Sequence, residues 1–259
     1  MVTYLDKIMA AHRDQAHSDH RRLDQLVELA REQSPTRGFR RALLDASGLA
    51  VISEIKRRSP SKGDLNPGID PATWASAYAR GGATCLSVLT DPEFFGGSAE
   101  DLGQARDSVS VPVLRKDFTV SALDVCDARL MGADAILLIV AALDDLELAD
   151  FHDLAVELGL DVLVETHHES EIDRALSVGA SIIGVNQRDL VTFEVDQERA
   201  LRLAGILPAE VVRVAESGVS GSADARLLYA AGYQAVLVGE ALMTSGDPAQ
   251  AVHELRVLR

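Results

Sequence analysis

The chain has 259 residues, of which 47% are hydrophobic, and its formal net charge at pH 7 is −15. This length and hydrophobic content suffice for one large domain with a sizeable core or for two small ones. The excess of acidic residues argues against a nucleic-acid partner, which needs a basic surface. The absence of any apolar run of about 20 residues argues against a membrane span.

Residues 1–45 precede the first apolar run and are expected to form a helical extension. Residues 4–16 and 23–31 have helical patterns, and we expect them to cover the bottom of the following domain or to flank its top. Three histidines of this region, His12, His17 and His20, are expected to be solvated. The mixture of acids, bases and histidines in residues 1–19 does not resemble a secretory signal.

The two cysteines of the chain lie far apart in the sequence. Cys85 belongs to a strand-like run and Cys126 to a helix-like one. Two separate reduced thiols are typical of a reducing compartment, so the sequence predicts a cytoplasmic location.

The first apolar run, residues 50–56, ends in two charged residues. Glu54 and Lys56 are two positions apart, so in a strand both point to the same side. Unpaired buried charges are costly in a core, so this pair indicates chemistry at the carboxyl end of the strand. The loop that follows, residues 57–63, carries three more basic residues, two serines and a glycine, which suits an anionic ligand.

Eight apolar runs rich in Val, Ile and Leu recur along the chain, as is typical of parallel strands covered on both faces. They are residues 50–56, 85–90, 111–116, 135–140, 161–166, 182–187, 211–217 and 235–239. Five of the amphipathic segments between them end in a glycine at the expected helix C-terminus. These are Gly82, Gly132, Gly159, Gly179 and Gly232.

Eight strand–helix units predict an α/β fold, namely a (β/α)8 TIM barrel over residues 46–259 with an N-terminal helical extension over residues 1–45. The alternative is a doubly wound open sheet. No Gly-x-Gly-x-x-Gly follows any of the runs, and eight even units favour closure.

Charged and amide residues follow the carboxyl ends of these strands, where the active sites of such barrels lie. They are Glu54, Lys56, Lys116, Glu165, Asn186, Arg188 and Glu216. Three glutamates and two lysines are therefore expected to converge on one mouth, where they would shift each other's pKa and serve as acids and bases. His167 and His168 lack a metal-binding spacing, so we predict no metal.

Two glycines follow the last two strands, where many barrels bind phosphate through backbone N–H groups. Ser217-Gly218 and Gly239-Glu240 occupy these places, and residues 241–244 could form a short helix. The alternative is that both are simple turn glycines. Phe95 and Phe118 could belong to the core or lie against an aromatic substrate.

Together these motifs resemble the indole-3-glycerol phosphate synthase family. The resemblance rests on Glu-Ile-Lys at 54–56, Ser-Pro-Ser-Lys-Gly at 59–63, Phe-Phe-Gly-Gly-Ser at 94–98, Leu-Arg-Lys-Asp-Phe at 114–118, Gly-Val-Asn-Gln-Arg-Asp-Leu at 184–190 and Ala-Glu-Ser-Gly at 215–218. It extends from about residue 45 to the end, and the first and fourth of these motifs are together the most specific.

The resemblance implies a carboxy-lyase of tryptophan biosynthesis that needs no cofactor. Its substrate would be a phosphorylated small molecule, 1-(2-carboxyphenylamino)-1-deoxyribulose 5-phosphate. Ring closure, decarboxylation and dehydration would give indole-3-glycerol phosphate, carbon dioxide and water. We expect the protein to act as a monomer, with at most weak self-association.

The resemblance also implies a role for each residue of the mouth. Lys116 would be the general acid on the ketone oxygen, Lys56 and Glu165 would assist the other proton transfers, and Glu54 would tune Lys56. Asn186 and Glu216 would hold the hydroxyls and the amine side, and Arg188 with Lys56 would face the anthranilate carboxylate. The aromatic slot would be lined by Phe95, Phe118, Leu137, Leu190 and Leu237. The phosphate would be surrounded by Ser59, Ser217, Gly218, Gly239 and Glu240.

Two residues depart from the family's pattern. Gln187 stands where small residues are common, and Glu240 stands where serine is frequent. We expect the backbone N–H of Glu240 to face the phosphate and its carboxylate to face solvent. A lysine beside another cation is expected to have a lowered pKa, which would let it exchange a proton near neutrality.

Two other functions compete with this interpretation. A phosphoribosylanthranilate isomerase would need a cysteine base at the end of the first strand, where this chain has a lysine, and Cys85 lies early in the second strand. A non-enzymatic barrel could bind a phosphorylated ligand or a protein, but it would not need five ionisable groups at its mouth.

Overall fold

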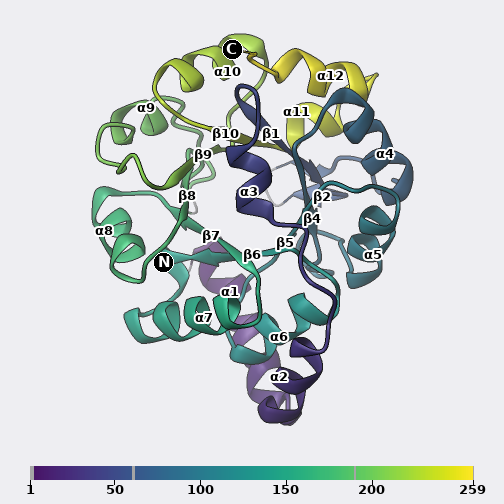
Figure 1. Ribbon diagram of the computed structural model, residues 1–259, viewed down its shortest axis with the longest axis vertical. Coiled ribbons are helices and arrows are strands. Elements are labelled where there is room, and N and C mark those ends of the chain that lie inside the picture. The colour runs from purple at the N-terminus through teal and green to yellow at the C-terminus, as the bar shows by residue number, and fades with distance from the viewer. Residues whose placement is uncertain (1–2, 60–61, 190, 259) are drawn as a thin grey trace.

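The computed structural model describes residues 3–59, 62–189 and 191–258. Eight parallel strands form a closed barrel in the order β1-β10-β9-β8-β7-β6-β5-β4 (Figure 1). They are β1 Ala50–Ile55, β4 Cys85–Leu89, β5 Val113–Lys116, β6 Ala135–Ile139, β7 Asp161–Thr166, β8 Ile182–Asn186, β9 Val212–Glu216 and β10 Ala235–Val238. The predicted TIM barrel is confirmed, and the open-sheet alternative is excluded because β1 pairs with both β10 and β4.

Helices follow the strands and form an outer ring around the barrel (Figure 1). They are α4 Pro71–Gly81, α5 Ala99–Asp107, α6 Ala122–Leu130, α7 Asp145–Glu157, α8 Glu169–Ser177, α9 Arg199–Leu203, α10 Ser222–Ala230, α11 Glu240–Met243 and α12 Pro248–Leu255, with a 3-10 turn η1 at Val140–Ala142. Local sequence sets several of the helix starts. Asp70 caps α4, with Pro71 in the first turn, and Ser98 and Ser121 cap α5 and α6 through side-chain oxygens.

The five glycines expected at helix ends are confirmed by their backbone conformation. Each has a positive φ, between 77° and 96°, which an L side chain rarely adopts. These glycines end the helices and turn the chain into the next strand, as the repeating pattern in the sequence indicates.

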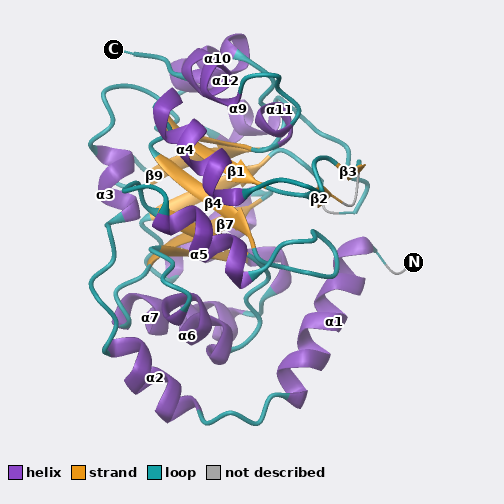
Figure 2. Ribbon diagram, turned by 90° about the vertical axis from the view of Figure 1, so that its right-hand side faces the viewer, coloured by secondary structure: helices purple, strands orange, loops and turns teal. Residues whose placement is uncertain are grey.

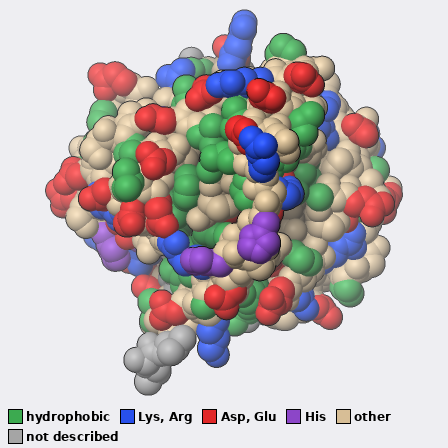
Figure 3. All heavy atoms as spheres, turned by 90° about the horizontal axis from the view of Figure 1, so that it is seen from below, with side chains coloured by type: hydrophobic (Ala, Val, Ile, Leu, Met, Phe, Trp, Pro, Cys, Tyr) green, Lys and Arg blue, Asp and Glu red, His purple; other side chains and the backbone are tan. Residues whose placement is uncertain are grey.

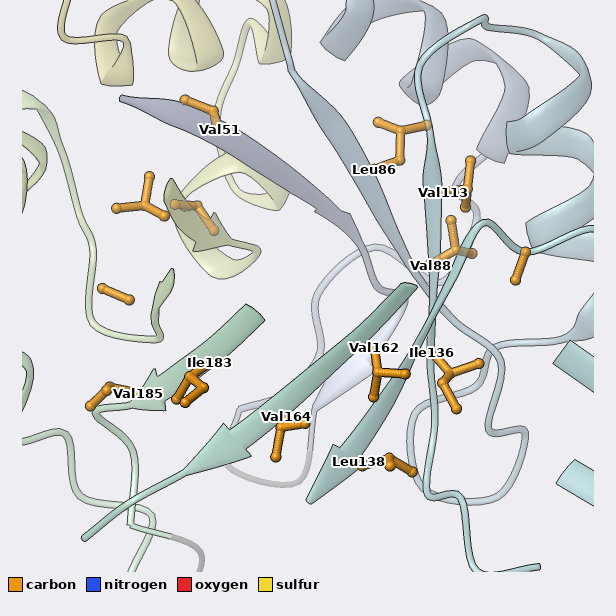
Figure 4. Packing of buried hydrophobic residues seen from close by; sticks show 14 of the residues in the cluster. Val51, Leu86, Val88, Val113, Ile136, Leu138, Val162, Val164, Ile183 and Val185 are labelled. Atoms are coloured by element: carbon orange, nitrogen blue, oxygen red, sulfur yellow. The ribbon is translucent and has the colours of Figure 1, made fainter. Parts of the chain in front are cut away.

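Alternation along the strands divides the buried hydrophobic residues into two cores. Residues pointing outward from the barrel pack against the helices, as Figure 4 shows for Val51, Val88, Ile136 and Val164. Residues pointing inward fill the barrel itself, among them Leu114, Leu163 and Val214. These three lie two positions before Lys116, Glu165 and Glu216, so the interior is apolar beneath the mouth and polar at it, as predicted.

The N-terminal extension reaches both ends of the barrel. Helix α1 (Tyr4–Ser18) and the small β2–β3 ribbon (Arg58–Ser59 and Gly63–Asp64) lie at one end in Figure 2, and α3 (Phe39–Leu44) lies at the other. Phe39 and Leu43 of α3 join the inner core and close the bottom of the barrel. Helix α2 (Leu23–Arg31) packs against α6. The sequence left open whether the extension covers the bottom or flanks the top, and it does both.

The surface carries many charges, in keeping with the composition. On the face seen in Figure 3, acidic side chains spread across the whole width, with Lys and Arg between them. Among the described residues, no helix is long and apolar enough to cross a membrane. Cys85 and Cys126 are both buried and form no disulfide.

Asp134 fastens the extension to the bottom of the barrel. Its side chain is fully buried and accepts hydrogen bonds from the backbone N–H groups of Arg37 and Val113, both at 2.8 Å. We expect Asp134→Ala to lower the free energy of unfolding by about 2–5 kcal/mol, because it leaves two buried donors without an acceptor at a cost of roughly 1–3 kcal/mol each. Urea denaturation measures this change.

The matched control is Asp173→Ala, which removes an exposed aspartate from α8. Substitutions of that kind change stability by about 0.5 kcal/mol or less. Equal stability losses in the two variants would contradict the role given to Asp134.

Candidate active site

A cavity of about 850 Å³ opens at the carboxyl ends of the strands. This volume lies within the range of small-molecule sites, roughly 300–1,000 Å³. Its walls come from the ends of all eight strands of the barrel, the loops that follow them and helix α1. All the polar residues that the sequence predicted at strand ends line it, namely Glu54, Lys56, Lys116, Glu165, Asn186, Arg188 and Glu216.

Glu54 and Lys56 form an ion pair at the end of β1. Lys56 Nζ donates to Glu54 Oε1 at 2.6 Å, and the carboxylate is only 5% exposed. Burial by itself would raise the pKa of Glu54, but the positive charges of Lys56 and then Lys116 lower it below the usual value. Glu54 is thus an ionised partner for both lysines.

Glu165 lies between an amide and a lysine. Asn186 Nδ2 donates to Glu165 Oε1 at 3.0 Å, and Lys116 Nζ lies 3.6 Å from Glu165 Oε2. Asn186 is fixed in turn, because its Oδ1 accepts from the backbone N–H of Arg188 at 3.0 Å. The strands β5, β7 and β8 therefore place a cation, a carboxylate and an amide in contact at one point of the mouth.

Glu216 is 1% exposed and lies at the end of β9. Burial, and then the neighbouring charge of Glu165, raise its pKa well above the usual value, and Lys116 offsets this only in part. Its Oε1 has no hydrogen-bond partner among the described residues. Burial thus disfavours ionisation of Glu216, and its Oε1 is available to a ligand.

Glycine on the neighbouring strand makes room for this carboxyl. A Cβ at Gly184 would stand 2.0 Å from Glu216 Oε1, so any side chain there would displace the acid. Gly239 likewise makes room for the Glu54–Lys56 ion pair, since a Cβ there would stand 2.3 Å from Glu54 Oε1. The sequence did not reveal these roles, because a glycine in a strand carries no sign of what approaches it.

The expected lowering of a lysine pKa is wrong for Lys116. Burial alone would lower its pKa, but the carboxyl groups of Glu165, Glu216 and Glu54 together raise it above the usual value. Lys116 carries a proton throughout the neutral range in the unliganded site. The acidic side chains around Lys116 raise its pKa by more than burial lowers it. The expectation considered only a neighbouring cation and did not include these acidic side chains.

The turn after β9 has an unusual backbone. Ser217 has φ 61°, which is uncommon for a residue with a side chain, and Gly218 follows with φ 72°. Gln187 Nε2 donates to the Ser217 carbonyl at 2.8 Å and so supports this conformation. The unexpected glutamine therefore has a structural role, and such conformations are typical of ligand-binding turns.

The short helix expected after β10 is present as α11, one residue earlier than predicted. Ser59, Ser217, Gly218, Gly239 and Glu240 all line the cavity, so the residues predicted for the phosphate share one wall with the loop after β1. Leu190, predicted for the aromatic slot, lies outside the described residues.

Phe95 and Phe118 both line the cavity and form a tilted ring contact, with centroids 6.1 Å apart. Leu237 also lines it. Leu137 does not line it: it lies one layer deeper in the inner core, and Ile139, two residues farther along β6, takes its place at the wall. The sequence did not predict that Tyr4, Leu5 and Ile8 of α1 line the cavity, because they are far along the chain from the strand ends that form it.

His12 is not solvated as expected. Its side chain is 14% exposed, its Nε2 is 3.0 Å from Asp91 Oδ2, and its ring packs against Phe118. His12, Asp91 and Asp117 are the described group of side chains close enough together to hold a metal ion. Their oxygens are already engaged, however: Asp117 pairs with Arg115, and Asp91 accepts two backbone N–H groups. Ion pairing that docks α1 accounts for this cluster.

Glu240 projects its carboxylate between two cations. It is 40% exposed, so it reaches solvent as predicted, but Lys62 Nζ lies 3.4 Å from Oε1 and Arg188 Nη2 lies 3.5 Å from Oε2. Arg188 also donates to the Phe193 carbonyl at 3.1 Å.

Comparison with known proteins finds one matching family and close sequence relatives. The family profile described as "Indole-3-glycerol phosphate synthase" matches residues 5–255. An indole-3-glycerol phosphate synthase of Mycobacteroides abscessus is 48% identical over 258 residues, covering 98% of this chain and 93% of that protein. Another, of Mycolicibacterium vanbaalenii, is 54% identical over 214 residues, covering 83% and 79%.

Solved structures show the same fold at low sequence identity. A thiamine phosphate pyrophosphorylase from Pyrococcus furiosus aligns with a TM-score of 0.58 and 18% identity, covering 81% of this chain and 93% of that one. At this identity the similarity concerns the architecture alone.

The raised pKa of Glu216 predicts a pH-dependent effect on stability. An unfolded Glu216 ionises above about pH 4.3, whereas the native one keeps its proton until its own higher pKa is reached. The contribution of Glu216 to stability is therefore fully present below the unfolded pKa and is lost as pH rises through the native pKa. We expect Glu216→Gln, which cannot titrate, to gain stability relative to the wild type as pH rises from about 5 to 8.

Melting curves at several pH values measure the difference between the variant and the wild type. Glu210→Gln, at an exposed position, serves as the control and should show a difference independent of pH. If the Glu216→Gln difference is equally flat, the native and unfolded carboxyls titrate alike and the assignment fails.

Proposed function

Because this chain belongs to the indole-3-glycerol phosphate synthase family, we propose that the cavity at the barrel mouth is the active site for the family's reaction. The enzyme converts 1-(2-carboxyphenylamino)-1-deoxyribulose 5-phosphate into indole-3-glycerol phosphate, carbon dioxide and water in tryptophan biosynthesis. It is a carboxy-lyase. The observation that carries the assignment of the site is the contact of Lys116 with Glu165, beside a second ion pair and the buried carboxyl of Glu216.

Ring closure joins the aromatic carbon that bears the carboxylate to the ketone carbon of the substrate. The ketone oxygen becomes an alkoxide unless it receives a proton as the bond forms. Lys116 is the donor in this proposal, because it is buried and protonated in the unliganded site. Its raised pKa is no obstacle, since an alkoxide is far more basic than an amine. Loss of carbon dioxide then restores the aromatic ring.

Dehydration requires a proton for the departing hydroxyl. It also requires a base that removes a proton from the carbon next to the amine. Lys56 is assigned as the donor and Glu165 as the acceptor. Glu54 supports Lys56 through their 2.6 Å contact and orients it. Asn186 orients Glu165 through its amide, and it holds the substrate's hydroxyls and amine side together with Glu216.

The ends of the substrate are assigned to the two sides of the cavity. Phe95, Phe118 and Leu237 form the aromatic slot, with Arg188 and Lys56 facing the anthranilate carboxylate. Ser59, Ser217 and the backbone N–H groups of Gly218, Gly239 and Glu240 surround the phosphate. The isomerase alternative lacks its base, because Cys85 is fully buried in the inner core and away from the mouth.

Two broader features belong to the same proposal. We infer a monomer that works in the cytoplasm, which light scattering and cell fractionation can test. The reaction itself is tested by the appearance of indole fluorescence when the substrate is added, and the absence of turnover despite tight binding of phosphate would favour a binding protein.

Replacing Lys116 tests the general acid. We expect Lys116→Met, which keeps the length and apolar stem of the side chain, to lower kcat by about 10²–10⁴-fold because the donor is lost. Steady-state kinetics measure the effect, and Lys7→Met on the exposed face of α1 is the control. A kcat near that of the wild type would remove Lys116 from the mechanism.

Replacing Glu165 tests the base. Glu165→Gln keeps an oxygen that can accept from Asn186 but cannot take up a proton, so kcat should fall strongly, by about 10²-fold or more, with a smaller change in KM. The pH–rate profile should lose its acidic limb. An unchanged profile and kcat would show that Glu165 has only a structural role.

A further inference from the structure

Glu240 connects two cations at the mouth of the cavity, and these two ion pairs are called the Glu240 bridge. Its two carboxylate oxygens each contact a different cation, Lys62 at 3.4 Å and Arg188 at 3.5 Å. These three residues come from the loops after β1, β8 and β10, and all of them line the cavity. One side-chain anion thus neutralises two cations that face the ligand space.

The position of Glu240 makes this bridge relevant to the substrate. Glu240 is the first residue of α11 and directly follows Gly239. It therefore belongs, with Ser217 and Gly218, to the lining residues to which the phosphate is assigned. A carboxylate that pairs with Lys62 makes the contact that a phosphate would make with this cation.

The contacts are also weak enough to exchange. The side chains of Lys62, Glu240 and Arg188 are 55%, 40% and 23% exposed, so water screens both pairs. Ion pairs with this exposure contribute little to stability. A phosphate, with more charge and more oxygens, can displace such a carboxylate.

A purely structural role would fit the contacts less well. Arg188 is already held by two other contacts. Its side chain donates to the Phe193 carbonyl, and its backbone N–H donates to Asn186 Oδ1. Lys62 lies on the exposed β2–β3 ribbon, and Glu240 is its ion-pair partner among the described residues. Arg188 therefore does not need Glu240 in order to stay in place, although Glu240 neutralises both cations.

We propose that the Glu240 carboxylate is an internal substitute for the substrate's phosphate. It holds Lys62 and Arg188 in the free enzyme and gives up Lys62 when the phosphate enters. This inference rests on the proposed function, because it takes the phosphate of that substrate as the competitor. Its consequence is that Glu240 weakens substrate binding relative to what the free cations would provide, and so sets KM.

The test removes the charge and keeps the shape. Glu240→Gln should bind inorganic phosphate about fivefold more tightly and lower KM by a similar factor. Titration calorimetry measures phosphate binding and steady-state kinetics measure KM. Glu194→Gln is the matched control, since it removes one negative charge from an exposed position of the loop after β8, and it should leave both quantities at wild-type values.

A double variant distinguishes competition between Glu240 and phosphate for Lys62 from a general effect of removing one negative charge. If the gain comes from the release of Lys62, then adding Lys62→Ala to Glu240→Gln should abolish the tighter phosphate binding. A Glu240→Gln variant whose phosphate affinity and KM are unchanged or weaker overturns the inference, and so does a gain that survives the loss of Lys62.

Failure of the proposed function would look different. Phosphate binding is measured without turnover, so a wild-type protein that shows no indole fluorescence could still show the fivefold gain. Conversely, normal turnover without that gain would leave the proposed function intact and reject the role of Glu240.

Discussion

The site depends on the mutual neutralisation of charges that the barrel buries together. Glu54, Glu165 and Glu216 are each 5% exposed or less, and Lys116 lies among them. A single buried charge of this kind would be too costly to keep. The group tolerates burial because two lysines compensate the carboxylates, and because the raised pKa of Glu216 disfavours a further negative charge there.

This compensation determines the chemistry that the mouth can perform. Carboxylates keep Lys116 protonated, so the unliganded site is ready to donate a proton rather than to remove one. When a substrate with an aromatic carboxylate and a phosphate enters, it brings new negative charge to the same lysines. In the proposed mechanism, proton donors then face the ketone with the Glu165 carboxylate beside them, which is the combination that closure and dehydration of the ring require.

The barrel supports this arrangement with features that lie outside the charged residues. Gly184 and Gly239 leave the space into which Glu216 and Glu54 project. Helix α1 covers part of the mouth and is fastened there by the contact of His12 with Asp91. Glu240 adds control of affinity at the edge, where exposure keeps its two ion pairs exchangeable.

The sequence by itself determined the fold and most of the residues of the site. The eight apolar runs, the glycines at helix ends and the alternation beneath Lys116, Glu165 and Glu216 are local patterns, and the closed barrel confirmed each of them. Tertiary structure alone decided the depth of Leu137, the burial of His12, the entry of Ile8 into the cavity and the two cations of Glu240. It also decided the direction of the Lys116 pKa, because that depends on carboxylates supplied by three other strands. A pattern along one strand gives the face on which a residue lies, but its partners come from strands far away in the sequence, and only closure of the barrel brings them within reach.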